Sequence, residues 1–171
     1  GLDLLPMDRE DFRVAIAERV SPAQTAANLE AYDLGERLIP GADKTIRRLR
    51  DKGKKVVFLS NKPLYTREDY AAKLTRLGIV TSPEEVVNST FVLIRYLTRV
   101  APDARVFVMG ELPFVSEMAR AGFRLTENPD EIEYVVAAFD RTFDYRKYNI
   151  AFQAIKKGAH FIATNPDRTC P

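Results

Sequence analysis

The chain has 171 residues, 46% hydrophobic and 29% charged, a composition typical of a globular protein with one domain or slightly more. Its 26 basic and 24 acidic residues are interspersed and leave a net charge of +2, which disfavours a nucleic-acid partner. Apolar runs of about six residues are far shorter than the ~20 that a membrane span needs, and the first residues lack the positive charge of a signal peptide, so we expect a cytoplasmic protein without a membrane partner.

The first 33 residues predict a helical amino-terminal segment. The apolar residues Phe12, Ile16 and Val20 recur at every fourth position, as they do along one face of a helix. A second helix is expected after Ser21-Pro22, because serine is a favoured cap and proline fits the first helical turn. Residues 1–33 show no obvious catalytic chemistry.

A first set of alternating elements follows this segment. Residues 42–52 predict a helix, and the apolar run 56–59 then ends abruptly at Ser60. Such a run is typical of a strand that is buried on both faces of a parallel sheet. Further helices are expected at 67–77 and 89–100.

The pattern restarts at Ala104 and gives a second set. Strands are expected at 105–110, 134–139 and 160–163, and helices at 113–121 and 145–157. Strands that alternate with helices of about ten residues predict an α/β fold built from parallel βαβ units. The two sets meet around residues 101–103.

Two predicted strand ends carry polar clusters, Ser60-Asn61-Lys62 and residues 164–168. Open α/β sheets bind ligands at the carboxyl ends of their strands, where a hydroxyl, an amide and backbone N–H groups can donate to a phosphate or carboxylate. The alternative is that these residues only form turns after a strand. Lys62 and Arg168 would either pair with an anion or remain solvated.

Other residues give weaker indications. His160, the only histidine, is expected to pack at the start of a strand rather than to catalyse, and Cys170, the only cysteine, is expected to be inert. Asp140-Arg141 follows a predicted strand and is interpreted either as a local ion pair or as a site where Arg141 reaches an anionic substrate.

Three phrases together carry a resemblance to a known family: residues 35–42, residues 57–61 and residues 164–169. In this order they resemble the 4-nitrophenylphosphatase-like branch (class IIA) of the haloacid dehalogenase (HAD) superfamily, whose members hydrolyse sugar and nucleotide phosphates. The likeness covers about residues 34–171. It implies a partial Rossmann-like core over 34–100 and a partial α/β cap domain over 101–171.

The resemblance also implies a chemistry. In this family an Asp of the first core strand attacks phosphorus, a second Asp acts as acid and base, and Mg²⁺ bridges the phosphate and the carboxylates. By position, Ser60 and Asn61 match the segment that holds the transferring phosphoryl group. Asn165, Asp167 and Arg168 match a cap segment that is expected to select the substrate, a small phosphorylated metabolite. A homo-oligomer is a further possible assembly of the chain.

The chain departs from the family's pattern at its catalytic motifs. No Asp-x-Asp-Gly occurs in the sequence, and residues 27–33 hold other side chains where that motif is expected. The Gly-Lys-Pro and Gly-Asp…Asp motifs expected after the cap are not found either, so neither catalytic residues nor metal ligands are identified. We therefore expect the chain alone to be inactive. The alternatives are a non-catalytic interaction or assembly module and a truncated gene product that retains the HAD fold.

Overall fold

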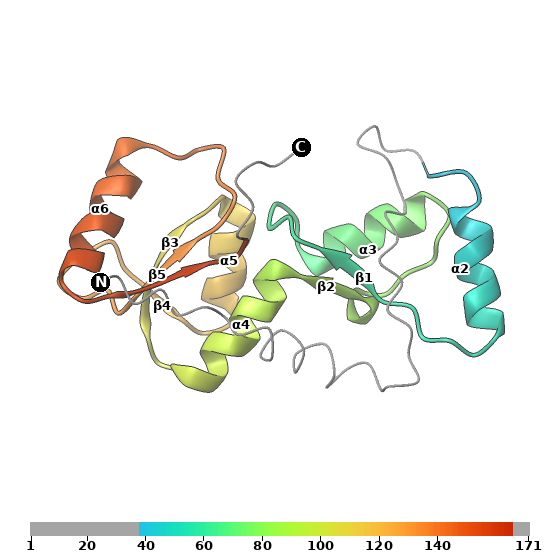
Figure 1. Ribbon diagram of the computed structural model, residues 1–171, viewed down its shortest axis with the longest axis horizontal. Helices are drawn as coiled ribbons and strands as arrows, with labels where there is room; N and C mark the ends of the chain where they lie inside the picture. Colours follow the sequence, from blue (N-terminus) through green and yellow to red (C-terminus); the bar gives the residue numbers. More distant parts are fainter. Residues whose placement is uncertain (1–37, 166–171) are drawn as a thin grey trace.

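A computed structural model describes residues 38–165 as alternating helices and strands (Figure 1). The elements are α2 (Ala42–Asp51), β1 (Phe58–Ser60), α3 (Arg67–Arg76), the 3₁₀ helix η1 (Pro83–Glu85), β2 (Val86–Asn88), α4 (Ser89–Val100), β3 (Arg105–Met109), α5 (Leu112–Arg120), β4 (Arg124–Leu125), β5 (Tyr134–Ala137), α6 (Tyr145–Lys156) and β6 (His160–Ala163). The strand pairs described are all parallel, which confirms the α/β prediction. Within residues 38–165, none of the helices combines the length and apolarity that crossing a membrane requires.

The smaller sheet consists of β1 and β2, which pair in parallel with Phe58 opposite Val86 and Ser60 opposite Asn88. Helices α2 and α3 cover one face of this sheet, and their buried side chains pack with Phe58 and Val86. Helix α3 begins at Arg67, where the sequence predicts it. The helix begins there because Thr66, the N-cap, and Asp69, three residues later, form a reciprocal capping box. The connection β1–α3–β2 is a parallel βαβ unit, the kind of unit that the alternation predicts, although its second strand was not itself expected.

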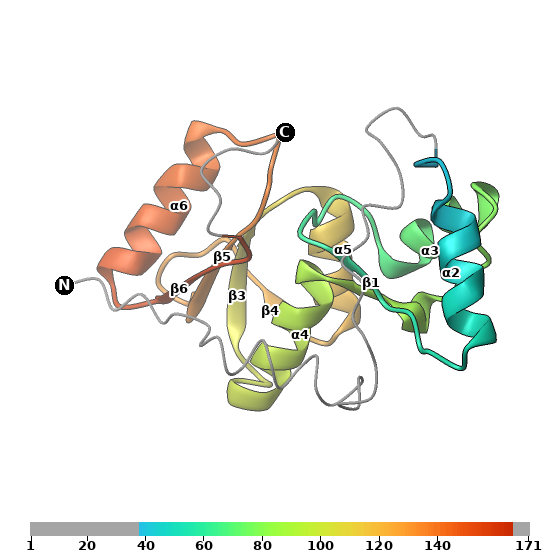
Figure 2. The same ribbon diagram turned by 45° about the vertical axis from the view of Figure 1, so that its right-hand side comes forward.

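The larger sheet has four strands in the order β4-β3-β5-β6. Side chains alternate between its faces: Val106 and Val108 join one core cluster with Leu97 of α4 and Met118 of α5. The opposite face carries Phe107, which packs in a second cluster with Val135 of β5 and with Ala151 and Ala154 of α6. Helices α4 and α5 thus cover one face and α6 covers the other (Figures 1 and 2).

Several expectations need correction. The strand of the smaller sheet begins at Phe58 rather than at residue 56, and it is not buried on both faces: Phe58 is buried, whereas Val57 and Leu59 are only half-buried. The short strands β2 and β4 were not predicted. The predicted amino-terminal helices lie outside the described residues.

Helix α4 belongs to both sets of elements. The sequence assigns it to the first set, and it does follow β2 directly. Its buried residues Leu93 and Leu97, however, pack into the core of the four-stranded sheet. The helix therefore links the two sheets through its own core contacts.

Candidate functional site

Ser60 lies where the sequence predicts it, as the last residue of β1, and is half-buried. Its hydroxyl is engaged on both sides: Oγ donates to Tyr70 Oη at 3.1 Å and accepts from the backbone N–H of Lys62 at 3.3 Å. The Tyr70 hydroxyl in turn donates to the carbonyl of Lys62 at 2.9 Å. Tyr70, on α3, thus fixes both the rotamer of Ser60 and the first turn of the loop after β1.

The other end of this loop is fixed by the neighbouring strand. Asn88, the last residue of β2, is 1% exposed and donates from Nδ2 to the carbonyl of Tyr65 at 3.2 Å. Its Oδ1 accepts from the backbone N–H of Phe91 at 2.8 Å and so caps α4. Ser89 Oγ donates to the carbonyl of Asn61 at 3.1 Å. The loop that follows Ser60 is therefore anchored to the β2–α4 junction near both of its ends.

Asn61 and Lys62 occupy the start of this anchored loop. Asn61 is exposed and Lys62 is half-buried. The structure thus brings Ser60, Asn61 and Lys62 together at the carboxyl edge of the smaller sheet, next to the capped start of α4. A helix start and a strand end at one edge are the usual setting for an anion site, but phosphate binding by these residues stays a prediction.

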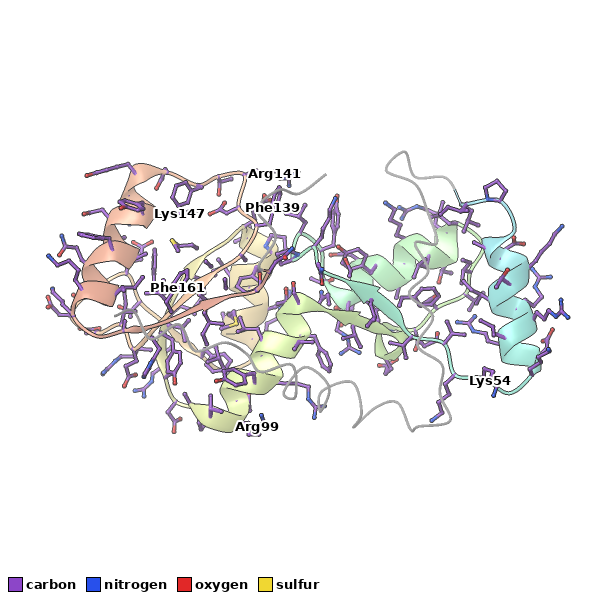
Figure 3. All side chains as sticks on the ribbon, in the orientation of Figure 1. Lys54, Arg99, Phe139, Arg141, Lys147 and Phe161 are labelled. Atoms are coloured by element: carbon purple, nitrogen blue, oxygen red, sulfur yellow. The ribbon has the colours of Figure 1, made fainter. Side chains whose placement is uncertain are left out.

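An ion pair lies at the corresponding edge of the larger sheet. Glu111 follows β3 and binds Arg141, from the loop after β5, in a bidentate arrangement: Nε donates to Oε1 at 2.7 Å and Nη2 to Oε2 at 2.8 Å. The backbone N–H of Arg141 also donates to Glu111 Oε1 at 3.0 Å. These bonds from Arg141 lower the pKa of Glu111 from its ordinary 4.5 to about 2. Figure 3 shows Arg141 and Phe139 on the side of the larger sheet that faces the loop after β1.

The two edges lie near each other. The pKa of Arg141 is raised first by its hydrogen bond and charge interaction with Glu111, and also by Tyr65 in the loop after β1. Tyr65 itself is half exposed.

A second ion pair braces the loop that carries Arg141. Lys147 is labelled beside α6 in Figure 3. Its Nζ donates to Asp140 Oδ2 at 2.7 Å and to Thr142 Oγ1 at 2.8 Å. Burial raises the pKa of Asp140, but the bonds from Lys147 and Thr142 outweigh it and hold the pKa below its ordinary value. The expectation that Asp140 and Arg141 form a local pair is wrong, because each binds a partner on another element. Since Glu111 neutralises Arg141, that residue is also not a free anion binder in this structure.

The second polar cluster is described only in part. Thr164 follows β6 and its backbone N–H donates to the carbonyl of Ala137 at 2.9 Å, which continues the parallel ladder. Asn165 is half-buried after it. Asp167 and Arg168, like Cys170, lie outside the described residues. His160 is exposed at the start of β6, with its ring 4.9 Å from that of Tyr134.

The described residues do not fit a magnesium site. Mg²⁺ prefers carboxylate oxygens, and between residues 38 and 165 no three Asp, Glu, His or Cys side chains lie close enough together to hold an ion. Ser60 and Asn61 offer only neutral oxygens. The described residues therefore cannot by themselves hold the metal that the family resemblance implies.

Sequence reasoning missed Tyr70 and Asn88. Tyr70 gave no signal, because an aromatic residue in an amphipathic helix is most simply a core residue. Asn88 did give one: Val86-Val87-Asn88-Ser89 repeats, in shorter form, the apolar-then-polar pattern that located Ser60. Two valines are too few to establish a strand period, so the pattern was not recognised.

Comparisons with known proteins agree on one group of enzymes. Residues 32–124 match the family described as haloacid dehalogenase-like hydrolase. The chain is 38% identical to the sugar-phosphatase AraL of Bacillus subtilis over 153 residues, covering 89% of this chain and 56% of that protein. It is 33% identical to an acid sugar phosphatase of Staphylococcus aureus over 138 residues, covering 81% and 53%.

A solved structure gives the same result for the fold. The p-nitrophenyl phosphatase from Archaeoglobus fulgidus superimposes with a TM-score of 0.76 at 30% identity, covering 82% of this chain and 54% of that chain. The chain thus spans about half the length of the relatives that it matches.

Proposed function

This chain belongs to the haloacid dehalogenase-like hydrolases, and we propose that it carries the phosphate-binding loop of a phosphatase acting on small phosphomonoesters. The observation that carries the proposal is the anchored loop after β1, which starts at Ser60 and is held by Tyr70 and Asn88. Two of the relatives are named as sugar phosphatases, which supports a sugar phosphate as the substrate class.

The proposed chemistry at Ser60 is donation to a phosphoryl oxygen. Its hydroxyl proton can turn from Tyr70 Oη to the ligand while Oγ continues to accept from the N–H of Lys62. Asn61 supplies its amide and backbone N–H beside it. Because the loop is already anchored at both ends, little ordering is needed when the ligand binds, and a preorganised donor is what stabilises charge in phosphoryl transfer.

Catalysis requires groups beyond this loop. The sequence contains no Asp-x-Asp-Gly, and the described residues contain no carboxylate cluster for Mg²⁺. We therefore propose that the chain alone hydrolyses little, because the members of a catalytic set act as a unit and the loss of one costs orders of magnitude in rate. Magnesium dependence and a small phosphorylated metabolite as partner are proposed only from membership in the family, because the described residues do not supply the metal ligands. A cytoplasmic location is likewise a proposal, made from the sequence alone.

The second candidate is a non-catalytic module that keeps this fold for interaction or assembly. The missing Asp-x-Asp-Gly favours it. The two candidates differ in one property: only the phosphatase reading requires that the loop after β1 binds phosphate.

The test is a phosphate titration of the ¹⁵N-labelled chain followed by NMR. We expect the amide resonances of Asn61 and Lys62 to shift with inorganic phosphate, and the Ser60→Ala variant to bind at least ~10-fold more weakly, since a lost hydrogen bond to a charged group costs ~1.5–3 kcal/mol. Thr66→Ala, at the far end of the same loop, is the matched control because Thr66 caps α3 instead. Equal binding by Ser60→Ala and the parent chain would refute the proposal.

A hydrolysis assay completes the test. With p-nitrophenyl phosphate and Mg²⁺ we expect no turnover above background. Turnover that disappears in Ser60→Ala would retain the phosphatase assignment but contradict the proposed inactivity. Absence of both phosphate shifts and turnover would favour the non-catalytic module.

A further inference from the structure

Helix α6 carries three exposed aromatic residues on its outer side. Tyr145 is 80% exposed, Tyr148 50% and Phe152 44%. Their spacing of three and four residues places them in one stripe along the helix. The rings contact each other in sequence, with centroids 6.2 Å apart between Tyr145 and Tyr148 and 6.1 Å between Tyr148 and Phe152. The Lys156 ammonium continues the row, 5.5 Å from the centroid of Phe152.

The core does not require these rings. The opposite side of α6 supplies the buried residues Ala151 and Ala154, which pack on the larger sheet. The views in Figures 1 and 2 place α6 at the outer side of that sheet, away from β1 and β2. Three adjacent exposed rings form an apolar patch of the kind that marks an interaction surface. We call the residues Tyr145, Tyr148, Phe152 and Lys156 the α6 stripe.

The cations that flank the stripe are neutralised within the chain. Arg146 pairs with Glu127, Lys147 with Asp140 at 2.7 Å, and Lys157 with Asp130 at 2.5 Å. These six residues contribute three charges of each sign, so the borders of the stripe carry little net charge. The segment 145–157 contains four basic residues and no acid, but three of these bases are paired with carboxylates on other segments. Two such surfaces can therefore approach each other without strong repulsion.

We propose that the α6 stripe is the contact surface between two copies of this chain, paired as antiparallel helices about a two-fold axis. The spacing supports this occupant, because the stripe is self-complementary when reversed. If the axis passes near position 150, Tyr148 of one protomer lies against the partner's Phe152, and Tyr145 lies against the partner's Lys156. Aromatic rings thus meet aromatic rings, and each terminal ring meets a cation.

The exposed area sets the expected strength. At ~200 Å² for each ring, the three aromatic residues expose about 350 Å², less than half of the ~800 Å² that each partner buries in a standard interface. Phe143, just before the helix and 55% exposed, adds about 100 Å² on the same scale. We therefore expect a weak dimer with a dissociation constant on the order of 100 µM.

The first test is sedimentation of the full chain over a concentration series from about 10 µM to 1 mM, a range that spans the expected constant. The parent chain should change from monomer to dimer, and Tyr148→Ser should raise the dissociation constant at least ~10-fold, as expected for a ring at the interface centre. Val80→Ser is the matched control, because Val80 is 73% exposed but lies far along the chain, between α3 and η1. A monomer at every concentration, or equal loss in both variants, would overturn the proposal and would favour a different occupant of the stripe.

The second test traps the proposed dimer covalently by a disulfide, so its readout is a cross-linked product and not a dissociation constant. In a Cys170→Ser background, Asn149→Cys places a thiol on the exposed side of α6 next to the proposed axis, where the partner's Asn149 would lie within a helix turn. Oxidation should give a covalent dimer in high yield. Thr98→Cys, exposed on α4, is the control and should remain monomeric. Equal cross-linking by the two variants would contradict the two-fold pairing, whatever the dissociation constant.

Discussion

Replacing Glu111 with Gln tests how much the ion pair between β3 and the loop after β5 contributes to stability. Glu111 accepts three hydrogen bonds from Arg141, and its side chain is only 12% exposed. A pKa lowered from 4.5 to about 2 corresponds to roughly 3 kcal/mol of preference for the charged state, at ~1.36 kcal/mol for each tenfold change. Because the Arg141 side chain is 63% exposed, solvent screening reduces the net effect to about 1 kcal/mol.

Chemical and thermal unfolding at pH 7 measure this effect. We expect Glu111→Gln to lower the free energy of unfolding by about 1 kcal/mol and the melting temperature by ~2–4 °C, the usual scale for a chain of this size. Glu127→Gln is the matched control, because it removes a pair with Arg146 in which both side chains are more than half exposed. We expect that variant to change stability by less than ~0.5 kcal/mol.

The pH dependence gives an independent check. The pKa of Glu111 is lower in the folded chain than in the unfolded chain, so its stabilising effect is present above pH ~4.5 and is lost as the pH falls toward 2. The difference between the parent chain and Glu111→Gln should therefore be constant from pH 7 to about 5 and shrink below that range. A difference no larger than that of Glu127→Gln, or one that grows on acidification, would refute the reasoning.

Three further predictions concern other residues. Burial, and then the charge of Glu68, raise the pKa of Glu117. Glu117→Gln should therefore stabilise the chain at pH 7 in urea unfolding, and this gain should disappear in acid, where Glu117 is protonated. A loss of stability at pH 7 would contradict this prediction. Leu97 is fully buried, so Leu97→Ala should cost ~2–5 kcal/mol by the same assay, and a cost below 1 would mean that the core is misplaced. Asn88→Ala removes the bond to Tyr65, so limited proteolysis should cut the loop after β1 faster than in the parent chain, and an unchanged rate would contradict its anchoring.

The sequence predicts those features that depend on local pattern. Helix α3 lies where the sequence predicts it, and the signals are local: Thr66 and Asp69 form a capping box within four residues, and Gly78 follows with a φ of 96° that stops the helix. The end of β1 was located because four apolar residues precede Ser60. In each case the information lies within one turn or one strand.

The missing features depend on residues far apart in the chain. Glu111 and Arg141 are 30 residues apart, and a turn containing Asp140-Arg141 suggests a local pair until the packing of β3 beside β5 brings Glu111 close. Strand β2 is buried because α3 and β1 cover it, not because its three residues have a strand period. The candidate site was therefore predicted at Ser60, while the residues that hold its loop were not.

The two parallel sheets differ greatly in size, and this has a consequence for how the chain unfolds. The pair β1–β2 shares three residue positions, whereas β3, β5 and β6 form ladders of four positions each within a sheet covered on both faces. Short ladders with few neighbours open first, so amide hydrogen exchange should be faster in Phe58–Ser60 and Val86–Asn88 than in the central strands β3 and β5. The loop that we assign to phosphate would then sit in the subdomain with the lower local stability, and a bound anion would protect that subdomain selectively.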